Sequence, residues 1–259
     1  MQTVLFHETV FGPIHSRRLG ASLGINLMPN DGKICSFDCL YCEAGYNAQG
    51  AGTSGLPTRE EVRERLESKL QQLRADNAPL DVITFSGNGE PTLHHHFAEI
   101  IDDTIALRDK YFPAVKISVL TNSTRISRPE VAAALRKVDN NILKLDSAFD
   151  STVRLLDRPA PGYSVERTIE GLASFGRQGI IQTMFTRGEH RGEPVDNTTD
   201  AEVDALIDAY RRIAPGEIMI YTIDRPTPET SLQRIPRAEL DVIADKIRRA
   251  TGIEVQVSG

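Results

Sequence analysis

Short runs rich in valine and isoleucine alternate with longer amphipathic stretches along almost the whole chain, and this alternation restricts the fold more than any other feature. The apolar runs show little strict polar–apolar alternation, which is typical of parallel strands buried on both faces. Right-handed β-α-β connections curl such a series into a parallel sheet with helices outside it. Six β-then-α units and a closing strand are too few for a full eight-unit barrel, so the sequence predicts an α/β fold, an open partial (β/α)6 barrel with parallel strands. The predicted strands are residues 22–28, 81–86, 114–121, 141–147, 180–186, 217–223 and 253–257.

Three predicted helices begin with the spacing of a capping box, in which a serine or threonine precedes a glutamate by three residues. The pairs are Thr58 and Glu61, Ser127 and Glu130, and Thr199 and Glu202. Further helices are expected at residues 95–108, 165–177 and 237–250. No linker of proline, glycine and serine divides the chain, so we expect residues 1–259 to form a single domain, with an N-terminal extension at 1–21 and a β/α core at 22–257.

Composition excludes several classes of protein. The 259 residues are 40% hydrophobic and carry a formal net charge of −6. No stretch approaches the roughly 18–20 continuous apolar residues of a membrane span, and the first ten residues lack the pattern of a secretory signal. We therefore expect a cytoplasmic protein with no membrane partner. A net negative chain also lacks the positive field of a dedicated nucleic-acid binder, so a nucleic-acid partner is possible but not favoured.

All three cysteines fall within eight residues, in the loop after the first predicted strand: Cys35, Cys39 and Cys42. Three thiols so close together cannot form a disulfide framework, and they indicate a reducing compartment and a metal site or cluster. Three cysteine ligands on a [4Fe–4S] cluster would leave one iron open to a small molecule. The alternatives are a zinc site with His15 as the fourth ligand, or three cysteines that bind no metal.

The arrangement C-x3-C-x-aromatic-C, with Tyr41 at the aromatic position, resembles the hallmark motif of the radical S-adenosylmethionine (radical SAM) superfamily. The resemblance implies a [4Fe–4S] cluster on the three cysteines, with S-adenosyl-L-methionine chelated to the open iron. It implies reductive cleavage of S-adenosyl-L-methionine to methionine and a 5′-deoxyadenosyl radical, which abstracts hydrogen from a substrate. A low-potential electron donor of flavodoxin or ferredoxin type is implied as well.

The loops after the next predicted strands extend this resemblance. The loop after residues 81–86 resembles the family's Gly-Gly-Glu-Pro motif, which contacts the amino group of S-adenosyl-L-methionine. Its residues are Gly87, Asn88, Gly89 and Glu90, with Asn88 where the family usually has glycine. Asn122 lies in a segment similar to one that related proteins place near the cofactor. Lys144 and Asp146 alternate along a strand and so point to one face, where they would hold the cofactor or form a purely structural salt bridge.

Arginines gather in the loops predicted to form the mouth of the barrel. Two Arg-Pro-x-Pro segments recur, beginning at Arg158 and Arg225, and Arg187 lies in the loop after residues 180–186. Because the planar guanidinium group suits carboxylates and phosphates, these arginines predict an anionic substrate, small molecule or macromolecule. The alternative is that they pair with nearby carboxylates in the chain, namely Asp157, Asp224 and Glu189.

The segment at residues 11–20, which includes Arg17 and Arg18, resembles the opening of a radical SAM subgroup that includes relatives of the tRNA wyosine-synthesis enzyme. Two alternative functions therefore stay open within the superfamily. One is a wyosine-like modification of a tRNA base, and the other is activation of a glycyl radical partner protein. A non-enzymatic iron–sulfur or zinc-binding module is the remaining alternative.

Overall fold

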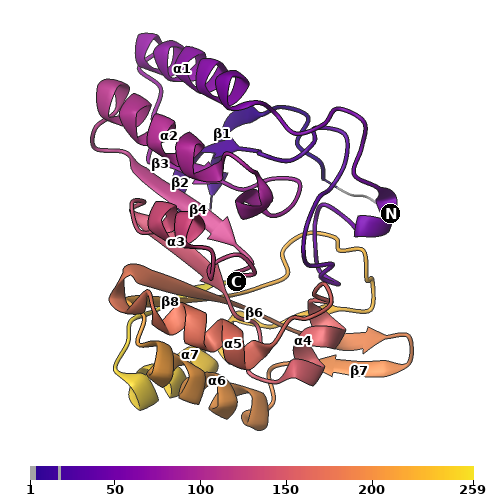
Figure 1. Ribbon diagram of the computed structural model, residues 1–259. Coiled ribbons are helices and arrows are strands. Elements are labelled where there is room, and N and C mark those ends of the chain that lie inside the picture. The colour runs from indigo at the N-terminus through magenta and orange to yellow at the C-terminus, as the bar shows by residue number, and fades with distance from the viewer. Residues whose placement is uncertain (1–3, 17–18) are drawn as a thin grey trace.

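The computed structural model describes residues 4–16 and 19–259; Arg17 and Arg18 of the N-terminal motif lie outside these ranges. Within them, one curled sheet has the strand order β1-β2-β3-β4-β5-β6-β8-β10, and every neighbouring pair from β2 to β10 is parallel (Figure 1). The open partial barrel is thereby confirmed. The strands are β1 (Val10–Ser16), β2 (Gly20–Ile25), β3 (Val82–Phe85), β4 (Lys116–Thr121), β5 (Asn140–Lys144), β6 (Gly179–His190), β7 (Glu193–Asp196), β8 (Glu217–Thr222), β9 (Gln233–Arg234) and β10 (Val255–Ser258).

Helices follow the parallel strands and cover one face of the sheet. The loops that come after the strands gather at one end of the sheet, on the right of Figure 1. Helix α1 shows why: its four buried residues recur at helical spacing and join the same core cluster as the strands. The helices are α1 (Arg59–Ala75), α2 (Phe97–Tyr111), α3 (Pro129–Leu135), α4 (Asp150–Leu156), α5 (Val165–Ala173), α6 (Asp200–Ile213) and α7 (Arg237–Thr251).

Two of the three predicted helix starts are confirmed. The Thr58 hydroxyl accepts a hydrogen bond from the backbone N–H of Glu61, and the Thr199 hydroxyl accepts one from that of Glu202. The third start, at Ser127, is wrong, because α3 begins at Pro129 with Arg128 as an N-cap that makes no side-chain bond. Proline suits the first helical position and keeps the residue before it extended, so the helix starts after Arg128.

Several elements differ from the prediction or were not predicted. Part of the expected N-terminal extension forms β1, which pairs antiparallel with β2 at one edge of the sheet. Helix α4 occupies a segment that the sequence predicts to be a loop. Two helical turns are too short to show a clear period in the sequence, so the pattern does not indicate this helix. Strand β6 continues to His190 and folds back as the β6–β7 hairpin.

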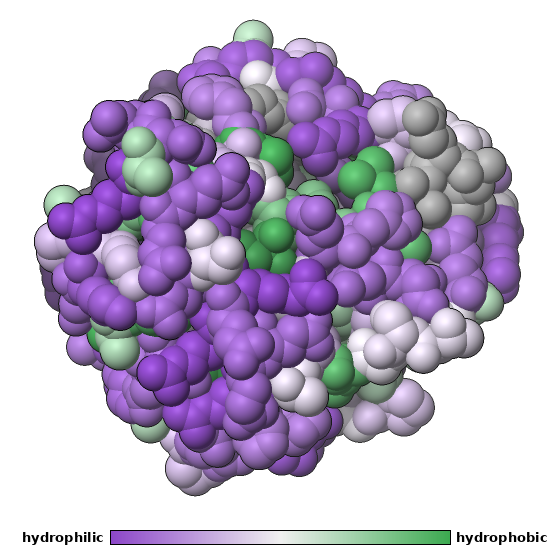
Figure 2. Space-filling model, turned by 90° about the horizontal axis from the view of Figure 1, so that it is seen from above, coloured by the Kyte–Doolittle hydropathy of each residue, from purple (hydrophilic) through white to green (hydrophobic). Residues whose placement is uncertain are grey.

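The surface at the α1 end of the molecule is mostly hydrophilic, with apolar side chains confined to small recesses (Figure 2). This agrees with α1, whose apolar side chains are turned to the core. In the described part of the chain, no helix is long and apolar enough to cross a membrane.

Candidate active site at the cysteine loop

The three cysteines lie in the long connection between β2 and α1, and the sheet itself positions this loop. Ile34 forms a parallel bridge with Gly89, in which Ile34 N–H donates to Asn88 O at 3.2 Å and Glu90 N–H donates to Ile34 O at 3.1 Å. The strand-like pairing ends next to Cys35. Two N–H groups, from Phe37 (3.4 Å) and from the Asn122 amide (3.5 Å), point at the Cys35 sulfur.

The donor set of three cysteines has the number of thiolates that leaves one iron of a [4Fe–4S] cluster open. Among the described residues, no three His, Cys, Asp or Glu side chains converge to hold one ion. His15, the proposed fourth zinc ligand, is exposed on the edge strand β1. Ligands of a [4Fe–4S] cluster bind separate irons of one compact cubane, so they surround the cluster without meeting at one ion. The zinc alternative is therefore not supported by the geometry.

Burial raises the pKa of Cys35 to about 12 and places the pKa of Cys39 well above its ordinary value. Without a cation these two thiols are protonated near neutral pH. Iron binds the thiolate and displaces the proton, so a site of this kind couples metal loading to proton release.

The Gly87–Glu90 turn is packed tightly against the cysteine loop, and its glycines are required by close backbone approach. A Cβ on Gly89 would lie 1.9 Å from the Ile34 carbonyl oxygen, and one on Gly87 would lie 2.4 Å from the side-chain oxygen of Asn26. Asn88 is fully buried, and its amide bonds the backbone of Phe6 and Pro29 at 2.8 Å. Its side chain thus anchors neighbouring segments, which explains why a residue other than glycine stands there.

Glu90 is buried and its two carboxylate oxygens accept four hydrogen bonds. Oε1 accepts from the Thr92 N–H (3.1 Å), the Thr92 hydroxyl (2.6 Å) and the Thr121 hydroxyl (2.6 Å), and Oε2 accepts from the Asn122 N–H (2.7 Å). Glu90 therefore ties the loop after β3 to the end of β4. Asn122 continues the chain of contacts, since its amide donates to both the Cys35 sulfur and the Ser36 hydroxyl.

The structure brings Tyr41, Lys144 and Asp146 together, and adds Asp157. The Lys144 ammonium contacts the Tyr41 hydroxyl and Asp146, and it lies 2.9 Å from Asp157. The Tyr41 hydroxyl lies 3.3 Å from Asp157 as well. Sequence reasoning treated Asp157 only as a partner for arginine, because nothing local shows that α4 turns this carboxylate inward.

Asp157→Asn is expected to flatten the dependence of stability on pH between about 4 and 7. Burial raises the pKa of Asp157 from 3.8 to about 7, although Lys144 opposes the shift. The folded state therefore binds more protons than the unfolded state in this window, and the wild-type stability falls as pH rises through it, at about 1.4 kcal/mol per pKa unit. Thermal unfolding across this range measures the effect, with the exposed Asp102→Asn as control. An unchanged pH profile in Asp157→Asn would contradict it.

Lys33 is a site residue that sequence reasoning missed. Its side chain is buried at the start of the cysteine loop, and its ammonium donates to Gly45 O at 2.6 Å and lies 3.7 Å from Asp38. Burial lowers the pKa of Lys33, but the three cysteines and Asp38 raise it by more, so it lies above its ordinary value. The only local signal was a lone lysine two residues before Cys35.

The three predicted substrate arginines all have carboxylate partners, but not those expected. Arg158 pairs with Asp38 at 3.2 Å, Arg225 pairs with Glu43 at 2.6 Å, and Arg187 contacts Glu239. The first two partners belong to the cysteine loop, so Arg158 and Arg225 lie beside the site. Arg187 instead joins β6 to α7.

A model of the radical SAM superfamily matches residues 30–197, which is more than half of the chain and includes the cysteine loop and the loops after β3, β4 and β5. The chain belongs to the radical SAM superfamily. Enzymes of this superfamily use a [4Fe–4S] cluster and S-adenosyl-L-methionine, so the predicted cofactors are confirmed for this chain. Membership of this superfamily of enzymes favours an enzyme over the alternative of a non-enzymatic module.

Curated relatives cover most of the chain. A UPF0026 protein of Synechocystis sp. is 32% identical over 235 residues, which cover 87% of this chain and 78% of that protein. A protein of Brachyspira hyodysenteriae named GTPase Obg is 28% identical over 254 residues, covering 96% of this chain and 35% of that protein. The chain thus spans about a third of the length of this second relative.

Solved structures of radical SAM proteins share the fold. A radical SAM methyltransferase from Sphaerobacter thermophilus matches with a TM-score of 0.68 and 18% identity, covering 92% of this chain and 65% of that one. Archaeal TYW1 matches with a TM-score of 0.52 and 15% identity, covering 89% of this chain and 72% of that one. At these identities the likeness concerns the fold.

Proposed function

We propose that the chain cleaves S-adenosyl-L-methionine reductively to methionine and a 5′-deoxyadenosyl radical, and that this radical abstracts hydrogen from an anionic substrate. The observation that carries the proposal is the cysteine loop, which holds all three cysteines of the chain within eight residues and is bridged to the Gly87–Glu90 turn. When bound, the cluster and S-adenosyl-L-methionine together supply one-electron cleavage of the sulfonium and a hydrogen-abstracting radical. In this proposal Cys35, Cys39 and Cys42 hold three irons as thiolates.

The chain's other residues bind and orient the cofactor in this proposal. In this proposal the backbone of the Gly87–Glu90 turn, which at Gly89 packs directly against Ile34 of the cysteine loop, offers carbonyl oxygens to the ammonium group of the cofactor. Asn88 and Glu90 act through this turn, because their side chains are already bonded within the protein. Tyr41, with Lys144 and Asp146, forms a polar wall for the nucleoside, carboxylate or hydroxyl groups of the cofactor.

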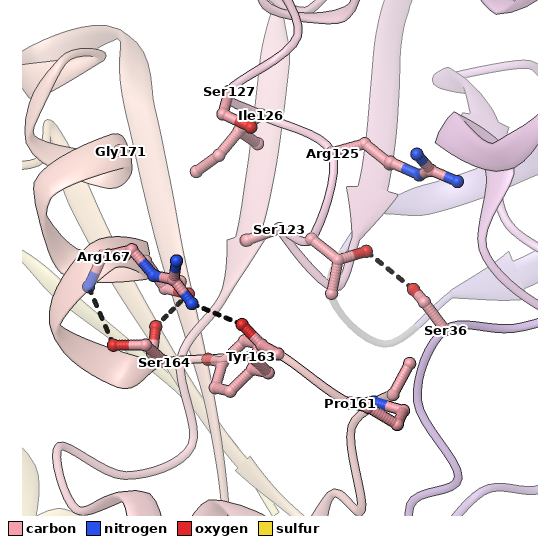
Figure 3. Close-up of a pocket in the computed structure, with 14 residues that line it drawn as sticks. Ser36, Ser123, Arg125, Ile126, Ser127, Pro161, Tyr163, Ser164, Arg167 and Gly171 are labelled. Atoms are coloured by element: carbon pink, nitrogen blue, oxygen red, sulfur yellow. Dashed lines mark hydrogen bonds between the residues drawn. The ribbon is translucent and has the colours of Figure 1, made fainter.

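A cavity of about 430 Å³ beside the cysteine loop supports an anionic substrate (Figure 3). Its wall includes Ser36, the residue after Cys35, which shares a 2.6 Å hydrogen bond with Thr124. Arg125 and Arg167 lie on opposite sides of it, and serine, threonine and apolar residues form the rest of the wall. Among the described residues, no carboxylate lines this cavity. We place the substrate here, because the arginines predicted for this role are already paired with carboxylates.

If the substrate is a phosphorylated small molecule, ribose 5-phosphate should raise the melting temperature, and ribose should not. At saturation the expected shift is several degrees, since about 1 kcal/mol corresponds to roughly 2–4 °C in a chain of this size. Arg167→Gln should remove most of the shift. Arg128→Gln, which removes an exposed arginine outside the cavity, should keep it. Equal shifts in both variants would contradict the placement.

A low-potential donor of flavodoxin or ferredoxin type and a cytoplasmic location belong to the same proposal, and we treat residues 1–259 as one domain. The cleavage is tested with protein reconstituted anaerobically with iron and sulfide, then reduced with dithionite in the presence of S-adenosyl-L-methionine. We expect 5′-deoxyadenosine and methionine in equal amounts, detected by mass spectrometry. A fully loaded, reduced protein that releases neither product would overturn the proposal.

A further inference from the structure

Lys33 is a buried cation that joins the two ends of the cysteine loop. It is 4% exposed and stands two residues before Cys35. Its ammonium donates to the carbonyl oxygen of Gly45, three residues after Cys42, at 2.6 Å. The side chain therefore passes alongside the cysteine segment from its beginning to its end.

The carboxylates around this ammonium are largely engaged by other partners. Its ion pair with Asp38 spans 3.7 Å. Asp38 is held more closely by the Asn47 N–H at 2.6 Å and by Arg158 at 3.2 Å. Glu90 accepts four hydrogen bonds from other groups. In the described part of the chain, Lys33 thus shares a single distant carboxylate with an arginine.

Asp146 and Asp157 do not compensate the charge of Lys33, because both contact Lys144. A buried ammonium is costly unless negative charge compensates it. The groups that can provide this charge are the cysteines, since Lys33 stands two residues before Cys35 and its ammonium reaches Gly45 O, three residues after Cys42. As thiolates on a cluster they bring the missing negative charge next to the ammonium.

We propose that Lys33 is a charge-compensating residue that raises the reduction potential of the cluster held by Cys35, Cys39 and Cys42. Reduction adds one electron, taken from a donor of flavodoxin or ferredoxin class, and no bond to Lys33 forms or breaks. A fixed positive charge at close range stabilises the reduced form more than the oxidised form, because the reduced form carries one more negative charge. The proposal depends on the cluster and not on cleavage of S-adenosyl-L-methionine.

The test is a redox titration of the full chain, reconstituted anaerobically and followed by the EPR signal of the reduced cluster, without S-adenosyl-L-methionine. Lys33→Met keeps much of the length and removes the charge. We expect its midpoint potential to fall by the equivalent of at least a tenfold lower reduction constant, which is about 59 mV for one electron. Lys33→Arg should stay near the wild-type potential, because it keeps the charge. Lys137→Met, which removes an exposed lysine paired with Asp102, should also leave it unchanged.

Iron and sulfide content is measured for each variant, so that a lost cluster is not mistaken for a shifted potential. If Lys33→Met loads poorly, Lys33→Gln replaces it, since glutamine offers a neutral donor in the direction of Gly45 O. A wild-type potential in a loaded, neutral variant would overturn the proposal. A fall of equal size in Lys33→Arg would overturn it as well, because the cause would then be packing and not charge.

Discussion

Replacing Cys35, Cys39 or Cys42 by alanine is expected to reduce S-adenosyl-L-methionine cleavage to the background of cluster-free protein. The chain has three cysteines and all of them belong to this motif, so no other thiol replaces a lost one. Three cysteines hold three of the four irons and leave the fourth open. Losing one cysteine therefore leaves a second iron without a protein ligand. The readouts are bound iron and sulfide per chain and the yield of 5′-deoxyadenosine under reducing, anaerobic conditions.

The matched control for the cysteine variants is Ser54→Ala. Ser54 lies in the exposed part of the same loop, where its hydroxyl donates to Asp31 at 2.8 Å. This variant disturbs the loop without touching a sulfur, and it should retain iron and activity. An alanine variant of any of the three cysteines that keeps both full iron content and full cleavage would contradict the assigned ligand set.

Glu90→Ala is expected to cost about 3–5 kcal/mol of unfolding free energy, a large effect for one side chain, because it strips the acceptor from several buried donors. The N–H groups of Thr92 and Asn122 would lose their partner together with two hydroxyls. Urea unfolding of the cluster-free protein measures the change. The exposed Glu130→Ala should cost less than about 0.5 kcal/mol and serves as control.

Glu90→Gln separates hydrogen bonding from shape. The amide keeps one oxygen but turns the other into a donor, so at least one backbone N–H, of Thr92 or of Asn122, faces a donor whichever way the amide is placed. We expect a cost of about 1–3 kcal/mol, the usual price of one unsatisfied buried donor. A variant as stable as the wild type would show that the carboxylate network is dispensable.

The order of strands and helices could be predicted from the sequence, because burial of parallel strands and amphipathic helices leaves a local pattern. Placing motifs in the loops after the strands then brought Cys35, Glu90 and Asn122 close together, as the structure shows. The predicted start of α3 at Ser127 is wrong. The helix begins at Pro129, because the preference of proline for the first helical position outweighs the capping pattern. Helix α4 was missed because two turns are too few to reveal a period.

Partner choice could not be predicted, because it is decided by contacts between residues far apart in the chain. Arg225 lies 182 residues from its partner Glu43, and the neighbouring Asp224 was the natural local guess. Lys33 and Asp157 gave no local signal of burial, since charged residues are usually exposed. The structure shows that the fold buries both side chains beside other charged groups.

The bridge between Ile34 and Gly89 divides the chain into positions that tolerate insertions and positions that do not. The register of the sheet sets the position of the cysteine loop. An inserted residue in β3 or before Gly89 would therefore move Ile34 by about one strand rise, roughly 3.3 Å. A displacement of this size is larger than a metal–sulfur bond can absorb. Arg191 and Gly192, by contrast, form the exposed tip of the β6–β7 hairpin, and a Cβ on Gly192 would meet nothing within 4 Å. Length variation among related chains should therefore collect at the tip of the β6–β7 hairpin and avoid the stretch from β3 to Gly89.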